Sequence, residues 1–162
     1  MSIRAHCHVR LTSRAPLRQG FVLYLFLLLG ATLSHAQGGI ALVQHTSKDA
    51  GTTTSSSLAF NLNNTPGNWV GVVIRAGKLG QLFTVSDSRG NTYHKAMQFN
   101  ETVDGTTLGI FYAENIISGP NTVTVSDTIL GTLRFAIFEY SGVALANSLD
   151  GAGVVGEEPV LV

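Results

Sequence analysis

Apolar and polar residues alternate strictly in several short segments of the chain after residue 36. In one such segment Leu58, Phe60 and Leu62 lie on one face of an extended strand, while Ser57 and Asn61 lie on the other. Alternation of this kind is typical of antiparallel sheets that bury one face and expose the other. Apolar residues do not recur there at helical spacing. The pattern therefore predicts strands and turns rather than helices.

Eight strands are predicted in this way, with Gly, Asn, Asp and Ser in the connections between most of them. Their spacing leaves no room for the crossover helices that parallel strands need. We therefore predict an all-β fold, an antiparallel β-sandwich of jelly-roll or immunoglobulin-like type. The polar run at residues 51–57 is either a flexible linker or, in its second half, part of the next strand. The predicted strands are residues 40–45, 56–62, 69–76, 82–87, 93–100, 107–113, 122–126 and 133–141.

Two of the predicted strands are apolar on both faces, at residues 70–74 and 135–138. A strand with apolar residues on both faces belongs in the middle of a sheet rather than at its edge. Parity also places Trp69 on the face of Val73 and Arg75, opposite to the more strongly apolar face of the same strand. We therefore expect Trp69 to be partly exposed on a central strand.

The first 36 residues have the pattern of a secretory signal peptide, which we expect to form a helix and to be cleaved after Ala36. A basic stretch without acidic residues precedes the uncharged apolar run at residues 21–29, and small residues occupy the cleavage positions. The apolar run is too short to span a bilayer, which needs roughly 20 residues. The prediction is a signal peptide at residues 1–36, a secreted or cell-surface β-sandwich at 37–150, and a weakly structured tail or partial strand at 151–162.

Charge and cysteine content narrow the range of partners. Four of the ten basic residues lie before Ala36, whereas all ten acidic residues lie after it. The part after Ala36 therefore has six basic and ten acidic residues and a formal charge of −4. Scattered charges of this sign argue against nucleic acid and anionic membranes as partners, and no membrane span is expected after cleavage. The single cysteine, Cys7, lies in the leader, so the exported chain is expected to lack internal disulfides.

Catalytic motifs are missing from the exported part of the chain, so we expect no enzymatic activity. The two histidines after residue 36, His45 and His94, have no cysteine or histidine at metal-ligand spacing, and there is no Gly-x-Ser-x-Gly motif. Glu139 stands out because it falls in the buried row of Phe135 and Ile137. It is either a functional carboxylate at the rim of a cleft or the end of the buried row, paired with a basic residue or a backbone amide.

Two kinds of ligand are worth considering. Sugars stack on flat aromatic rings, so Trp69, Tyr93 and Tyr112, together with the Glu139 carboxylate, are candidate ligand-binding residues. Oxygen ligands for a structural calcium ion could come from Asp87 and Asn91 in a tight turn, although an aspartate in a turn more commonly forms an Asx-turn. No other cofactor is expected.

Several segments together resemble a secreted β-sandwich domain of environmental bacteria, often found beside immunoglobulin-like and fibronectin-like modules in large surface or exported proteins. The resemblance implies motifs that mark turns and strand ends, with no catalytic residues to transfer. Related domains continue for several strands after the segment that corresponds to Tyr140-Ser-Gly142. The chain is therefore either a complete domain or one truncated at its C-terminus. The segments are Phe83-Thr-Val-Ser-Asp-Ser-Arg-Gly-Asn-Thr-Tyr93, Ile110-Phe-Tyr-Ala-Glu-Asn115, Gly119-Pro-Asn-Thr-Val-Thr-Val125 and Arg134-Phe-Ala-Ile-Phe-Glu-Tyr-Ser-Gly142.

The functional expectation follows from export, the β pattern and the missing catalytic motifs. We expect an exported non-catalytic module for adhesion, surface architecture or glycan contact, with a polysaccharide or a cell-surface protein as its partner. The alternative is a fragment of a carbohydrate-active enzyme or a lectin-like domain, suggested by Glu139, Trp69 and the shared architecture. Because fold does not imply function, that alternative rests on analogy.

Overall fold

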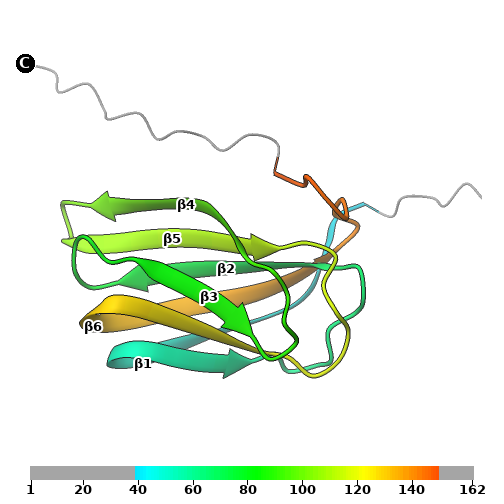
Figure 1. Cartoon of the computed structure of the whole chain (residues 1–162), viewed down its shortest axis with the longest axis horizontal. Helices are drawn as coiled ribbons and strands as arrows, with labels where there is room; N and C mark the ends of the chain where they lie inside the picture. Colours follow the sequence, from blue (N-terminus) through cyan, green and yellow to red (C-terminus); the bar gives the residue numbers. More distant parts are fainter. Residues whose placement is uncertain (1–38, 150–162) are drawn as a thin grey trace, which may run out of the picture. The chain divides into compact units, whose positions relative to one another are not determined.

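The computed structural model describes residues 39–149, and within this range the chain forms six β-strands and no helix (Figure 1). Every pair of neighbouring strands is antiparallel. The predicted all-β antiparallel fold is therefore confirmed. The strands are β1 (Ala41–Ala59), β2 (Trp69–Ala76), β3 (Phe83–Asp87), β4 (His94–Glu101), β5 (Thr106–Ala113) and β6 (Thr122–Ser141).

The two longest strands, β1 and β6, pair with each other along most of their length. Five strands follow the order β1-β6-β2-β5-β4, and β3 pairs with β6 outside this path. Residues 133–140 of β6 pair with β2, whereas residues 123–127 pair with β3. β1 accompanies β6 along both parts. In Figure 1, β3 lies in front of the five-stranded path, and the arrangement is consistent with a β-sandwich.

Four of the predicted strands form only two in the structure. The predicted strands 40–45 and 56–62 fall at the two ends of β1, and the polar run at 51–57 lies inside it. Because β1 ends at Ala59, Leu62 lies beyond the strand and is exposed rather than on its buried face. The predicted strands 122–126 and 133–141 are likewise the two ends of β6. The β1–β6 ladder continues through register shifts between Asp49 and Thr52 and between Thr53 and Ser55. Such bulges bend a strand without ending it, which allows one strand to serve two layers.

The core is formed by the inward-facing residues of β2, β3, β5 and β6, together with residues of the loops. In β2, Val70, Val72 and Ile74 are fully buried, as are Leu133 and Ile137 in β6. Both segments predicted to be central have neighbours on each side, β6 and β5 for β2, and β1 and β2 for the second part of β6. The prediction that these two strands are central is confirmed.

The first residue of β3 packs against β5, a strand with which β3 does not pair. A Cβ added to Gly109 of β5 would lie 2.7 Å from Cδ2 of Phe83, the first residue of β3. This distance is shorter than van der Waals contact, so the phenyl ring packs directly on the Gly109 backbone. Phe83 and Phe111 are both buried in the same core cluster. Only glycine leaves room for this packing at position 109.

Several predictions concern residues outside the described range. The signal-peptide helix, its cleavage after Ala36 and the tail at 151–162 all lie there and remain predictions. Among residues 39–149, no helix is long and apolar enough to cross a membrane.

Candidate functional site

Aromatic side chains gather at one end of the outer face, by which we mean the face of the path β1-β6-β2-β5-β4 that points away from the core. Trp69 of β2 lies opposite Tyr140 of β6, and Tyr112 of β5 lies opposite His94 of β4. Residues directly opposite each other in antiparallel strands share a face. Four neighbouring strands therefore contribute one aromatic ring each to the same surface.

The rings contact one another across the strands. The ring centroids of Trp69 and Tyr112 are 5.9 Å apart, and the ring planes differ by only 14°. Tyr140 meets the indole edge-on, at 6.1 Å between centroids, and His94 lies 5.4 Å from Tyr112. Offset and edge-on arrangements at these distances are favourable for aromatic pairs. The cluster is therefore a packed surface rather than a set of independent side chains.

Gly71 allows the indole to lie close to the sheet. A Cβ at position 71 would be 2.6 Å from Cζ3 of Trp69, so the ring covers the Gly71 backbone. Gly71 pairs with Tyr112 on β5, which brings the indole beside the Tyr112 ring. Any larger residue at position 71 would push the indole away from Tyr112. We call the hollow that is lined by Trp69, Tyr112 and Tyr140 the Trp69 hollow.

The Trp69 hollow is open and mostly apolar, with a volume of about 240 Å³. Ser148 forms part of its rim: the Trp69 Nε1–H donates to Ser148 Oγ at 3.1 Å, and the Ser148 backbone N–H donates to Glu114 Oε1 at 2.6 Å. The side-chain and backbone hydrogen bonds of Ser148 hold the pKa of Glu114 below its ordinary value. The lining residues are Ile40, Trp69, Tyr112, Tyr140, Val143, Ser148 and Leu149.

The structure brings together two of the four residues named from the sequence as ligand-binding candidates. Trp69 and Tyr112 share the hollow. Tyr93 packs against the core instead, and its hydroxyl donates to Asp87 Oδ2 at 3.0 Å. Burial and the neighbouring Asp87 carboxylate raise the pKa of Tyr93. The fourth candidate, Glu139, points to the inner side, where its residue is fully buried.

Glu139 is held by four donors, none of which is charged. On Oε2, Gln44 Nε2 donates at 2.6 Å and Asn64 Nδ2 at 2.7 Å. On Oε1, the Thr65 backbone N–H donates at 2.8 Å and Asn68 Nδ2 at 2.7 Å. Burial alone would raise the pKa of Glu139, but these hydrogen bonds outweigh it and hold the pKa below its ordinary value. The carboxylate thus ties β6 to β1 and to the loop after β1.

The turn around Asp87 is occupied by hydrogen bonds of its own. Asp87 Oδ1 accepts the backbone N–H groups of Arg89 and Asn91, at 3.0 and 3.1 Å. Its Oδ2 accepts the side chains of Asn91, Tyr93 and Asn121 at 2.7 to 3.0 Å. Although burial would raise the pKa of Asp87, these donors lower it. Within residues 39–149, no group of three His, Cys, Asp or Glu side chains is placed to hold a metal ion.

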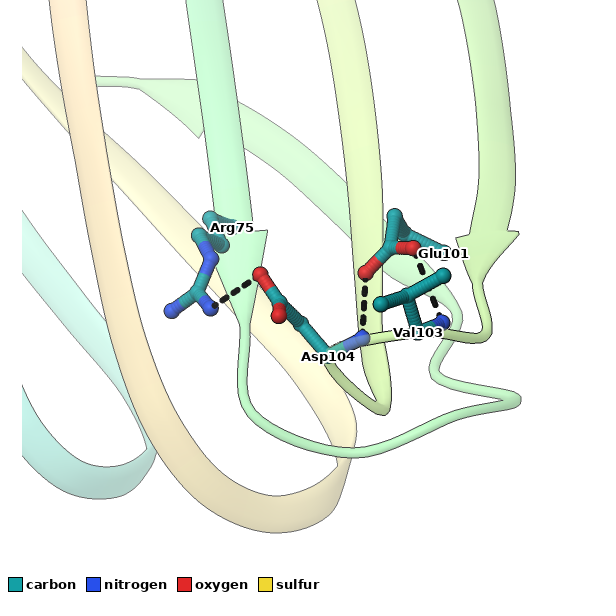
Figure 2. A network of polar contacts seen from close by, with 4 residues as sticks. All are labelled: Arg75, Glu101, Val103 and Asp104. Atoms are coloured by element: carbon teal, nitrogen blue, oxygen red, sulfur yellow. Dashed lines mark hydrogen bonds and ion pairs between the residues drawn. The ribbon is translucent and has the colours of Figure 1, made fainter.

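A second hollow, of about 370 Å³, lies on the outer face beside Arg75 and Arg134. Arg134 Nε lies 2.8 Å from Asp49 Oδ2, and Arg75 Nη2 lies 3.7 Å from Asp104 Oδ2. Figure 2 shows Arg75 at the end of β2, facing the β4–β5 turn that carries Asp104. We call this the arginine hollow. It is lined by Ser47, Lys48, Asp49, Val73, Arg75, Arg134, Phe135 and Ala136.

Some of these contacts could not be found by sequence reasoning. The position of His94 beside Tyr112 depends on the register of β4, which contains a bulge between Lys95 and Met97. The role of Ser148 in the rim depends on a turn after β6 that carries no strand pattern. The alternation of side chains along the strand was the one signal available. It placed Trp69 on the face opposite to Val70, Val72 and Ile74, where the structure also places it, partly exposed.

Comparison of the chain with protein-family models, with curated proteins and with solved structures finds no match. Any functional conclusion therefore rests on the geometry of the described residues.

Proposed function

We propose that the chain is an exported, non-catalytic module that contacts glycans through the Trp69 hollow and so serves adhesion or surface architecture. The observation that carries this proposal is the pair of nearly parallel rings of Trp69 and Tyr112 in an open apolar hollow. The C–H faces of sugar rings pack well on such a surface. Binding sites of this type combine an apolar lining with a few polar groups that orient the ligand.

The rim supplies those polar groups. Ser148 and Glu114 are joined by a hydrogen bond at one side of the hollow, and His94 stands beside Tyr112. Glu114 is partly exposed and its pKa is lowered by hydrogen bonds from Ser148, so it is a carboxylate acceptor at neutral pH. Sugar hydroxyls donate well to such acceptors. An apolar floor with an acceptor at its edge fits a carbohydrate better than a purely apolar ligand.

The placement of the carboxylates supports binding rather than hydrolysis. Common glycosidases use two carboxyl groups, about 5 to 10 Å apart, that both contact the sugar. Glu139 has an exposed fraction of 0 %, and all four of its contacts are internal donors. Asp87 is likewise held by five internal donors. A structural role explains both carboxylates without a substrate.

Replacement of Trp69 by alanine tests the proposal. We expect the full-length chain to bind at least one polymer from a set of neutral and acidic plant and bacterial polysaccharides. Electrophoresis in gels that each contain one soluble polymer measures this, because a polymer that binds the chain retards it. Trp69→Ala should weaken that binding by at least about tenfold, since a central aromatic anchor typically contributes 1.4 kcal/mol or more. The circular dichroism spectrum should keep its β character, because Trp69 lies outside the core.

Leu82→Ala is the matched control, because it removes an exposed apolar side chain (61 % exposed) that does not line the hollow. This variant should bind as the unmodified chain does. If the unmodified chain binds none of the polymers, or if Trp69→Ala binds them equally well, the proposed function is wrong.

A further inference from the structure

Two arginines lie directly opposite each other on neighbouring strands of the outer face. Arg75 of β2 is the register partner of Arg134 of β6, and Asp49 of β1 is the partner of Arg134 on the other side. Side chains in such pairs have Cβ atoms about 4.5 to 5.5 Å apart, and like charges in these positions destabilise a sheet. The sheet therefore keeps an unfavourable pair of positive charges at its surface.

The two aspartates only partly offset this pair. Asp49 accepts from Nε of Arg134, and within residues 39–149 this is the one hydrogen bond that the guanidinium makes. Asp104 lies 3.7 Å from Arg75, beyond hydrogen-bond distance, and its side chain is 67 % exposed. Glu101 accepts the backbone N–H groups of Val103 and Asp104, which fixes this turn (Figure 2). Within residues 39–149, the guanidinium of Arg75 and the Nη groups of Arg134 therefore make no hydrogen bond.

The space next to the two arginines is suited to a planar anion. The arginine hollow is open, and the small side chain of Ala136 and the exposed Val73 lie on its floor. A guanidinium presents its N–H groups in a planar fork that matches a carboxylate in two parallel hydrogen bonds. Two such groups side by side in an open hollow can hold a carboxylate between them.

The arginine hollow and the Trp69 hollow lie on the same face and along the same strands. Trp69 and Arg75 belong to β2, and their partners Tyr140 and Arg134 belong to β6. The two ends are six positions apart on each strand, a distance of about 20 Å at roughly 3.4 Å per residue. A linear polysaccharide can extend over this length with several sugar units. The lining between the ends includes Val73 and Ala136, which offer no charge that would repel it.

We propose that the outer face binds a uronic-acid-containing polysaccharide, with one sugar on the Trp69 hollow and the carboxylate of another between Arg75 and Arg134. This inference rests on the proposed glycan function and specifies its ligand class. The formal charge of −4 on the part of the chain after Ala36 opposes an acidic ligand only weakly, because charges beyond about 8 Å are screened at physiological salt. The two nearby carboxylates, Asp49 and Asp104, offset the positive charge of the arginines only in part. The guanidinium groups of Arg75 and Arg134 both line the site itself.

Polygalacturonate and its fully methyl-esterified form provide a direct test, because they share a backbone and differ in the carboxylate. We expect the full-length chain to bind polygalacturonate at least about tenfold more tightly than the ester, as expected for loss of a charge-assisted hydrogen bond. Arg75→Gln and Arg134→Gln should each remove most of this preference. Lys78→Gln is the matched control, because it removes an exposed positive charge from the β2–β3 loop and should leave binding unchanged.

Asp49→Asn gives a second test of opposite sign. It removes the negative charge beside Arg134, so binding of polygalacturonate should become tighter by about threefold or more, while binding of the ester should not change. If the unmodified chain binds both polymers equally and the arginine variants have no effect, the acidic ligand class is wrong and the glycan function stands. If it binds neither these two polymers nor any neutral polysaccharide, both proposals are wrong.

Discussion

Replacement of Glu139 by glutamine is expected to lower the free energy of unfolding by about 3 kcal/mol or more. The side chain keeps its size, but one carboxylate oxygen becomes an NH₂ group that faces two donors. Hydrogen bonds to a charged group contribute about 1.5 to 3 kcal/mol each, and a buried donor left without an acceptor costs about 1 to 3 kcal/mol. With four donors on this carboxylate, the loss is a large part of the total stability of a small domain.

Urea unfolding at pH 7, followed by circular dichroism, measures this difference. Glu101→Gln is the matched control, since Glu101 is the partly exposed last residue of β4 and its two hydrogen bonds to backbone N–H groups are exposed to solvent. This change should cost less than about 1 kcal/mol. Asn64→Ala and Asn68→Ala should each destabilise less than Glu139→Gln, because each removes a single donor. A Glu139→Gln variant as stable as the unmodified chain would show that the buried carboxylate is not the tie between β6 and the loop after β1.

Acidification is expected to destabilise the domain strongly between about pH 5 and pH 2. The folded-state pKa values of Glu139 and Asp87 lie below their ordinary values of 4.5 and 3.8. A carboxylate with a lowered pKa contributes stability that is fully present above its unfolded-state pKa and is lost as the pH falls through its folded-state pKa. Each unit of difference between the two values corresponds to about 1.4 kcal/mol.

Asp127 acts in the opposite direction, because burial raises its pKa and protonation then favours the folded state. The carboxylates with lowered pKa values, which include the fully buried Glu139, outweigh this single group. Urea midpoints measured at intervals from pH 7 to pH 2 should therefore fall, and the fall should be shallower in Glu139→Gln than in the unmodified chain. Midpoints that stay constant or rise below pH 5 would contradict the role assigned to the two carboxylates.

Periodicity predicted the strands of this fold better than their connections. The central position of β2 and of the second part of β6 is evident from the sequence, because both segments are apolar on both faces. The continuity of β1 could not be predicted, because residues 51–57 have the composition of a linker and are held in a strand only by pairing with β6. Tertiary pairing of this kind routinely overrides local preference.

The site was predictable to a smaller extent. Parity placed Trp69 on the outer face, but the neighbours of Trp69 are set by the registers of β4, β5 and β6, which no local pattern encodes. Glu139 was recognisable as an unusual charge in a buried row, and one predicted kind of partner, a backbone amide, is present at Thr65. The three side-chain amides that complete its shell come from β1 and the loop after it, which meet only in the folded chain.

Trp69 is the only tryptophan in the chain, so its fluorescence reports directly on the hollow. The most direct measurement is a titration of the full-length chain with polygalacturonate and, in parallel, with its methyl ester, followed by tryptophan emission. Glycan binding at the outer face predicts a saturable change in emission with at least one polymer, at the same concentrations that retard the chain in gels. Retardation without any change in emission would place the binding elsewhere, and neither effect with any polysaccharide would show that the hollow does not bind glycans.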